Sequence, residues 1–432
     1  MNCKAVVVLL TLAALAMTSA VPAQASQYKV IYAFHGGTDG EIPEAELISD
    51  SSGNLYGTTE FGGSAKSGTV FKLTRGSGGD WTETVLFHFS NGSEGGQPVA
   101  SLTFDAAGNV YGTTSAGGDS TCIPLHGACG VVFELTPNSD GSWSETVLHS
   151  FTGPDGLYPQ AGVTFDGSGN LYGTTVSGGA QAAGTVYKLS QNGDGTWSEA
   201  VLHSFGKNSS GGAGANSKLV FDSAGNLYGT TSSGGNMSAC NGSGCGTVFE
   251  LTPQSDGTWS SQVLHRFNGT SGGFPVGVVF DSAGNLFGAA PSGGVGNCYG
   301  LVLTGCGVVY ELTPALGGSW QGKQVRAFSG THAGSPNPVI VDSAGNVYGT
   351  GRSGGSQACS FGCGAIYKLA PASGGGWTLT GLYEFPGGTN GNWPYAGLTM
   401  DSAGNIYGTT GSGGDLSCES FSGCGVVFQI IP

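Results

Sequence analysis

Seven near-copies of one short motif organise this 432-residue chain. Each copy reads Asp-x-x-Gly-Asn, then an aliphatic residue, then Tyr or Phe, then Gly. The copies are separated by 55, 61, 56, 59, 61 and 59 residues. Their aspartates are Asp50, Asp105, Asp166, Asp222, Asp281, Asp342 and Asp401. So regular a period predicts one structural unit repeated seven times.

Each unit reads as four β-strands, most clearly in the fourth copy. Residues 218–221, 227–231, 246–251 and 259–267 are short runs of aliphatic, aromatic and β-branched residues. We name these strands a, b, c and d. The motif itself forms the a–b turn, because Asp accepts backbone hydrogen bonds and Gly adopts positive φ.

Four strands per unit at this period are typical of a β-propeller blade. A β-helix is the main alternative, but its repeats are much shorter than these. Helical repeats are excluded because no 3.6-residue periodicity occurs. The sequence therefore predicts an all-β, seven-bladed β-propeller with four-stranded antiparallel blades.

The two ends of the chain predict how the ring closes. Strand d begins with Trp in six units, whereas the seventh unit stops after its strand c. Residues 28–34 match strand d in sequence, so we expect them to pair with the last blade. The blades would span residues 45–89, 99–151, 160–205, 217–267, 276–328, 338–385, and 395–431 plus 28–34. Closure would remove exposed sheet edges, and residues 26–432 would form one domain.

Residues 1–25 have the features of a removable secretory signal peptide. Lys4 gives a positive start, residues 5–20 are apolar, and Ala23-Gln24-Ala25 is a typical cleavage site. We therefore expect a secreted protein, extracellular or periplasmic. No other apolar run is long enough to span a membrane.

Charge excludes one class of partner. Thirteen basic against twenty-eight acidic residues give a formal net charge of −15. Nucleic-acid binding requires a basic surface, so we expect no nucleic-acid partner.

Ten of the eleven cysteines form five close pairs, and the eleventh, Cys3, lies in the signal peptide. An even number of cysteines in a secreted chain predicts disulfides. Metal binding is the alternative, but the spacing varies from pair to pair. The expected pairs are Cys122 with Cys129, Cys240 with Cys245, Cys298 with Cys306, Cys359 with Cys363, and Cys418 with Cys424.

The seven motifs, with the Gly-Thr-Val-Phe-Glu-Leu strands, resemble the GloVer tandem repeats of bacterial secreted proteins, the "choice-of-anchor" group. The resemblance covers nearly all of the chain after the signal peptide. It implies a secreted, repetitive bacterial protein and brings no assigned activity. Many members look anchored through a C-terminal sorting segment, and this chain departs from that pattern by ending at Pro432 after a strand.

Binding residues are expected on the face formed by the b–c and d–a loops. These loops vary between blades, and varied loops on a uniform scaffold commonly carry binding sites. Most d–a loops end in a residue followed by Pro, and these residues would form a ring near the channel mouth. Three are aromatic and suited to stacking on a ligand, although packing as core caps is the alternative. The nominated residues are Tyr158, Phe274, Trp393, Gln97 and Asn337, with Asn337 placed at the same repeat position as the others.

Histidines provide a weaker functional signal. His149, His203 and His265 share one position on strand d, where other blades have Tyr, Phe or Arg, so we expect packing residues there. His35, His126 and His332 lie in the varied loops with acids such as Asp39, Glu41, Glu44, Glu94 and Asp155. They offer the groups of a metal-assisted lyase or hydrolase, as in propeller lyases of the streptogramin-lyase type, but the likeness is architectural only.

The sequence favours a non-enzymatic propeller that binds an extracellular ligand, either a glycan or a cell-envelope protein. The first alternative is a metal-assisted lyase or hydrolase at the channel mouth. The second is a structural matrix or surface-layer component. No catalytic residue, metal site or cofactor is predicted, since no H-E-x-x-H motif occurs and the repeated Asp lacks the oxygen ligands of a calcium loop.

Overall fold

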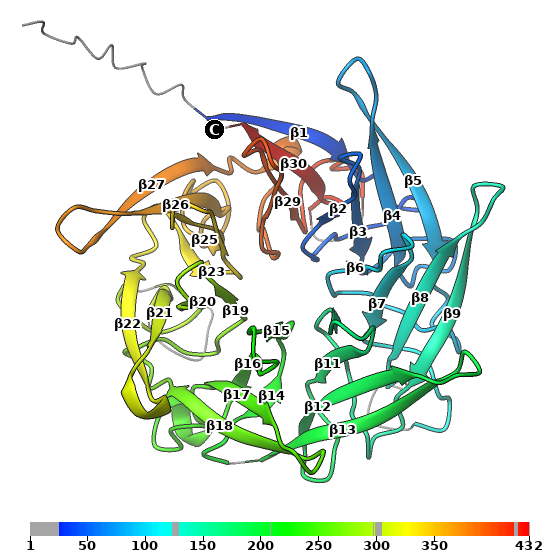
Figure 1. Cartoon of the computed structure of the whole chain (residues 1–432). Coiled ribbons are helices and arrows are strands. Elements are labelled where there is room, and N and C mark those ends of the chain that lie inside the picture. Colours follow the sequence, from blue (N-terminus) through cyan, green and yellow to red (C-terminus); the bar gives the residue numbers. More distant parts are fainter. Residues whose placement is uncertain are drawn as a thin grey trace, which may run out of the picture.

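The computed structural model describes residues 26–122, 129–207, 209–296, 298, 305–418 and 422–431. These residues form seven antiparallel sheets in a ring around a central axis (Figure 1). The predicted all-β, seven-bladed propeller is therefore confirmed. The predicted signal peptide, residues 1–25, lies outside the described residues.

The strands of each blade run outward from the axis in the order a, b, c, d. Strands a are β2 (Ile48–Ser49), β6 (Thr103–Phe104), β10 (Thr164–Phe165), β15 (Val220–Phe221), β19 (Val278–Phe280), β24 (Ile340–Val341) and β28 (Thr399–Met400). Strands b are β3 (Leu55–Thr59), β7 (Val110–Thr114), β11 (Leu171–Thr175), β16 (Leu227–Ser233), β20 (Leu286–Ala290), β25 (Val347–Ser353) and β29 (Ile406–Thr410). Strands c are β4 (Thr69–Arg75), β8 (Val131–Pro137), β12 (Ala182–Gln191), β17 (Thr247–Pro253), β21 (Val308–Pro314), β26 (Ala365–Pro371) and β30 (Val426–Ile431). Strands d are β5 (Trp81–His88), β9 (Trp143–Ser150), β13 (Trp197–Gly206), β18 (Trp259–Arg266), β22 (Trp320–Ala327), β27 (Trp377–Glu384) and β1 (Gln27–Ala33).

Blades four and six carry a fifth strand that the sequence analysis did not predict. These strands are β14 (Ala213–Ala215) and β23 (Gly334–Pro336), and each is formed by the d–a loop. They pair with the ends of β16 and β25, which are two residues longer than the other strands b. In the other five blades the same loop makes a single isolated bridge just beyond the end of strand b. The loop therefore follows one path around the ring, with more hydrogen bonding in two blades.

Ring closure takes place as the sequence predicted. Strand β1 pairs antiparallel with β30, with Tyr28 opposite Ile430 and Ala33 opposite Val426. The Tyr28 ring also stacks on Tyr383 of blade six, with ring centroids 3.7 Å apart. The N-terminal strand thus completes blade seven and packs against its neighbour (Figure 1).

The repeated motif folds each a–b turn through its aspartate. Asp222 Oδ1 accepts the Ala224 and Asn226 amides, and Oδ2 accepts the Asn226 side chain and the Tyr228 hydroxyl. Partial burial acts to raise the pKa of Asp222, but these hydrogen bonds outweigh it and hold the pKa below its usual value. The turn is therefore a structural element, as predicted.

The motif ends in an aromatic residue and a glycine, and both contribute to the packing of the sheets. The Tyr228 ring contacts Trp320 of the next blade edge-on at 5.9 Å, and equivalent contacts join Tyr56 to Trp143 and Tyr172 to Trp259. A larger residue would not fit in place of Gly229, because a Cβ there would lie 2.7 Å from the Phe249 ring. The core of the molecule therefore consists of these layers between successive blades.

All five predicted cysteine pairs form disulfides, each within a b–c loop. Such bonds are typical of an oxidising compartment. In every loop the second cysteine directly precedes the glycine before strand c, and it is fully buried. The bonds join Cys122 to Cys129, Cys240 to Cys245, Cys298 to Cys306, Cys359 to Cys363, and Cys418 to Cys424. The predicted pairing is therefore confirmed.

No helix in the described part of the chain is long and apolar enough to cross a membrane.

Candidate functional site

A cavity of about 650 Å³ lies on the propeller axis and is lined by the inner segments of all seven blades. A volume of this size is within the range of small-ligand sites. The lining segments run from each d–a loop into strand a, so their first residues lie nearest the varied-loop face. The residues of each segment form successive layers along the axis.

The layer nearest the varied loops is polar in five blades and apolar in the other two, which contribute Val99 and Val276. Glu44, Gln160, Asn216 and Tyr395 each lie six residues before a turn aspartate, and Asn337 joins them from a blade whose loop is one residue shorter. The Asn216 Oδ1 atom is buried without a hydrogen-bond partner among the described residues. A buried, unpaired amide oxygen is costly unless a bound molecule donates to it.

The next layer lies four residues before each turn aspartate and carries two opposite charges. Glu46 comes from blade one and Lys218 from blade four, whereas the other blades contribute small or neutral residues. Lys218 Nζ donates a hydrogen bond of 2.9 Å to Thr103 Oγ1 of blade two. The lysine side chain therefore reaches past blade three to blade two. The neutral members of the layer are Ser101, Gly162, Gly277, Pro338 and Gly397.

Burial shifts both ionisable groups of this layer toward neutrality. Desolvation raises the pKa of Glu46 and lowers that of Lys218, and each opposes the shift of the other by charge attraction. The described residues place no ion-pair contact within 4.0 Å between them. The carboxylate fits beside Gly397, where a Cβ would lie 3.4 Å from Glu46 Oε2.

A second charged group surrounds Glu44, where blades one, six and seven meet. Burial raises the pKa of Glu44 to about 7, the nearby Glu60 adds to the shift, and Arg352 opposes it. The Arg352 guanidinium lies 4.2 Å from the centre of the Tyr395 ring, which is a cation–π contact. Glu44 is therefore poised to change charge near neutral pH.

Only Asn337 of the five nominated ligand residues lines this cavity. Its amide nitrogen donates to Thr350 Oγ1 at 2.8 Å and to the Pro394 carbonyl at 2.7 Å. The other four lie just outside, where the d–a loop meets the preceding blade. Tyr158, Phe274, Trp393 and Gln97 are all half-buried and have positive φ.

Positive φ at these positions lets each backbone N–H reach the preceding blade. The Tyr158 amide donates to Cys129 O, and the Trp393 amide to Cys363 O. The Phe274 amide donates in the same way to Cys245 O. The indole Nε1 of Trp393 also donates to Gly362 O at 3.1 Å. These loops therefore join neighbouring blades whether or not they contact a ligand.

The same contact occurs where the ring closes. Ile42 precedes Pro43 in the first d–a loop and has a positive φ of 59°. Its amide donates to Cys424 O of blade seven at 2.9 Å. The second cysteine of a disulfide thus presents its carbonyl to the following blade here as well.

The repeat position assigned to Asn337 is wrong by two residues. Ser335, which precedes Pro336, has the positive φ of 51° and donates its amide to Cys306 O, as Tyr158 and Trp393 do in their blades. The Ser-Pro-Asn-Pro segment contains two x-Pro pairs, and the first of them is equivalent to the x-Pro pair of the other loops. In blade four Gly214 takes this position, with a positive φ of 69°.

The two loop histidines that the structure describes do not converge on one centre. His35 pairs with Asp39 at 3.3 Å, and His332 pairs with Glu384 at 3.0 Å. Glu94 instead accepts hydrogen bonds from Ser90. His126 lies outside the described residues.

The strand-d histidines pack as predicted, edge-on against phenylalanines. The ring centroids are 4.8 Å apart for His149 and Phe151, and 4.6 Å apart both for His203 with Phe205 and for His265 with Phe267. His149 makes further polar contacts, described below.

Sequence reasoning missed the Glu46–Lys218 layer, and a signal for it was available. When the seven units are aligned on the turn aspartate, the position four residues earlier is charged only in these two copies. A charge at a position otherwise occupied by Ser, Gly or Pro marks a departure from purely structural repetition.

Comparison with known proteins identifies the family. The model of the Gloeobacter/Verrucomicrobia repeat matches residues 20–122, 120–304 and 241–432. The chain belongs to this family. The predicted resemblance is thereby confirmed, and no curated protein matches the sequence significantly.

Solved structures share the fold at low identity. An ulvan lyase of polysaccharide lyase family PL25, bound to -[GlcA(1-4)Rha3S]-, is 11% identical with a TM-score of 0.55, covering 92% of this chain and 95% of that one. A fungal alcohol oxidase of the AA5 family, in complex with copper, is 14% identical with a TM-score of 0.55, covering 94% of this chain and 76% of that one. These similarities concern the fold alone.

Proposed function

We propose that this protein is a secreted, non-enzymatic propeller that binds an extracellular glycan on its varied-loop face. One sugar unit of the glycan enters the axial cavity. The observation that carries the proposal is the polar layer at the cavity entrance, in which amides, a carboxylate and an aromatic ring from different blades surround one space. A cell-envelope protein is the other ligand class expected from the sequence.

The chemistry of this layer suits a saccharide. Gln160 and Asn216 offer amide groups that can both donate to and accept from hydroxyls. Tyr395, held under Arg352, offers a ring on which a sugar can stack. The unpaired Asn216 oxygen would accept a sugar hydroxyl. A single sugar ring presents several hydroxyls at once to such a pocket, and this favours the glycan over the cell-envelope protein.

The nominated loop residues would form the rim of the same site. Tyr158, Phe274 and Trp393 precede the segments that line the cavity and are partly exposed. Gln97 lies at the equivalent position in blade two. They would contact the glycan where it leaves the cavity, while Asn337 would contact the sugar inside it. The ulvan lyase, a protein of the same fold, has a glycan bound, which supports this class of ligand.

A glycan array followed by calorimetry tests the proposal. The wild-type protein should retain a defined set of glycans, and Gln160→Ala and Asn216→Ala should each weaken binding by about 1 kcal/mol or more, since each removes a hydrogen-bonding group. Gln321→Ala removes an exposed amide from the outer strand β22 and is the matched control. Binding that both cavity variants leave unchanged would refute the axial site.

A lyase or hydrolase is the second candidate, and Lys218 is the observation that favours it. Burial lowers the pKa of this lysine, and lysines with lowered pKa can act as general bases. Recovery of the bound glycan distinguishes the two functions. A binding protein returns the glycan intact, whereas an enzyme returns products that the Lys218→Met variant fails to form.

A further inference from the structure

We infer a divalent transition-metal site between blades two and three, formed by His149, Asp155 and Glu199. The site lies at the outer edge of the ring, away from the axial cavity, and goes beyond the proposed glycan binding. Its ligand atoms are one imidazole nitrogen and two carboxylate oxygens, all within 4.8 Å of one another. Imidazole with carboxylates is a donor set for zinc and similar divalent ions.

Three different elements bring these side chains together. His149 lies on β9, Asp155 in the loop that follows it, and Glu199 on β13 of the next blade. His149 Nε2 lies 2.9 Å from Asp155 Oδ2, and these two side chains are 19% and 16% exposed. The group is thus enclosed by protein and still reached by solvent.

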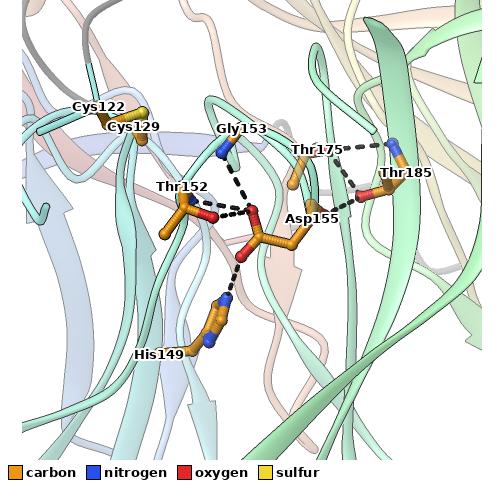
Figure 2. Close-up of polar contacts among 8 residues, drawn as sticks. All are labelled: Cys122, Cys129, His149, Thr152, Gly153, Asp155, Thr175 and Thr185. Atoms are coloured by element: carbon orange, nitrogen blue, oxygen red, sulfur yellow. Dashed lines mark hydrogen bonds and ion pairs between the residues drawn. A yellow bond between two sulfur atoms is a disulfide. The ribbon is translucent and has the colours of Figure 1, made fainter. Parts of the chain in front are cut away.

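Other contacts hold Asp155 so that one oxygen remains available. Its Oδ1 accepts the Thr152 amide, the Thr152 hydroxyl and the Gly153 amide, at 2.9, 3.1 and 3.1 Å (Figure 2). The backbone carbonyl of Asp155 accepts Thr185 Oγ1 of blade three at 3.0 Å. These contacts fix the carboxylate and direct Oδ2 toward His149. Metal ligands are commonly oriented by hydrogen bonds of this kind.

Glu199 brings an acceptor oxygen without a partner to this group. Its Oε1 atom is buried and has no hydrogen-bond partner among the described residues, as is also true of Glu83 and Glu145 at the two preceding junctions. Within the part of the chain that the structure describes, at this junction alone a histidine nitrogen lies beside the two carboxylates. A cation between the three groups would satisfy the unpaired oxygen and offset the repulsion between the two acids.

The repeat itself provides natural comparisons. The two preceding junctions keep the acid pair, with Asp39 near Glu83 and Glu94 near Glu145, but Tyr32 and Phe87 replace the histidine. The two following junctions keep a histidine, but Ser261 and Gly322 replace the outer glutamate. In the described residues, the junction of blades two and three alone combines all three ligand types.

Zinc titration of the EDTA-treated full chain tests the site. A competing chromophoric chelator should report one tightly bound Zn²⁺ per chain. His149→Phe should weaken this binding at least tenfold, and Glu199→Gln should do so without altering the aromatic packing. His203→Phe, which removes a histidine packed in the same way, should bind zinc like the wild type.

Phe at position 149 is expected to preserve the fold, because Phe87 already occupies the equivalent position and packs edge-on against Phe89 at 5.0 Å. Saturating zinc should raise the melting temperature of the wild type and of His203→Phe, but not of His149→Phe, since a bound ion stabilises only the state that binds it. Absence of stoichiometric zinc binding, or equal binding by His149→Phe and the wild type, would overturn the inference. Calcium binding that persists in His149→Phe would overturn it as well, because it would assign the site to the carboxylates alone.

Discussion

Lys218 Nζ of blade four donates a 2.9 Å hydrogen bond to Thr103 Oγ1 of blade two, so one side chain joins blades that are not neighbours. Neighbouring blades are held by extensive apolar layers, whereas this contact spans the intervening blade three. The lysine side chain is half-buried, and the charge of Glu46 opposes the loss of its hydration. The two charges therefore depend on each other.

Removing Lys218 should destabilise the ring more than removing both charges. Lys218→Met removes the attraction that opposes the desolvation of Glu46, and leaving a desolvated polar group without compensation costs about 1–3 kcal/mol. The double variant Glu46→Gln/Lys218→Met should recover most of that loss. Thermal melts at pH 7 measure both, with the exposed Lys207→Met as control. Equal melting temperatures for the single and double variants would show that the charges do not interact.

Glu44 should make stability depend on pH. Its pKa is raised from 4.5 to about 7, through burial and the repulsion of Glu60 against the attraction of Arg352. The folded state then binds more protons than the unfolded state between these values. The contribution of Glu44 to stability is therefore greatest below about pH 4.5 and falls as pH rises toward 7.

The Glu44→Gln variant isolates this effect from that of other buried acids. Glutamine keeps the size of the side chain and does not titrate. The melting temperature of Glu44→Gln, measured relative to that of the wild type, should rise from pH 4.5 to pH 8. A difference that is constant over this range would mean that Glu44 keeps an ordinary pKa.

The fold was predictable because its determinants are local and repeated. The motif Asp and Gly specify the a–b turns, and the match between residues 28–34 and strand d specifies closure. The fifth strands were not predictable, because β14 and β23 depend on how far β16 and β25 extend beyond the motif. The error at Asn337 has a similar origin, since two x-Pro pairs in one loop give the same local pattern.

The site was less predictable because it consists of departures from the repeat. Lys218, Glu46 and Arg352 come from different blades, and their proximity depends on the ring rather than on spacing along the chain. His149 has the same packing role as Phe87 and pairs with Asp155 of the following loop, whereas Glu199, the third member of this group, comes from the next blade. Sequence alone placed each residue on its strand or loop but did not pair residues between blades.

Because β1 closes the ring, its removal should destabilise the protein and promote aggregation. Deleting residues 28–34 would leave the outer side of β30 without a partner strand and expose the edge of blade seven, which favours aggregation. Size-exclusion chromatography should show loss of monomer, and the melting temperature should fall. Tyr28→Phe keeps the strand and the stacking on Tyr383, and should remain monomeric. A deletion variant that stays monomeric with unchanged melting would contradict closure.

Variants of Trp393 can distinguish stacking on a ligand from the contact between blades, because the ring and the indole N–H of this residue have different roles. The N–H donates to Gly362 O of the preceding blade, whereas the half-exposed ring is available to a ligand at the proposed rim. Trp393→Phe keeps a ring and should retain glycan affinity while losing about 1 kcal/mol of stability with the hydrogen bond. Trp393→Ala should additionally weaken glycan binding by about 1 kcal/mol or more. Calorimetry beside thermal melts measures both effects. If Trp393→Ala melts at a lower temperature but binds glycan as tightly as the wild type, Trp393 only joins the blades and the rim must lie elsewhere.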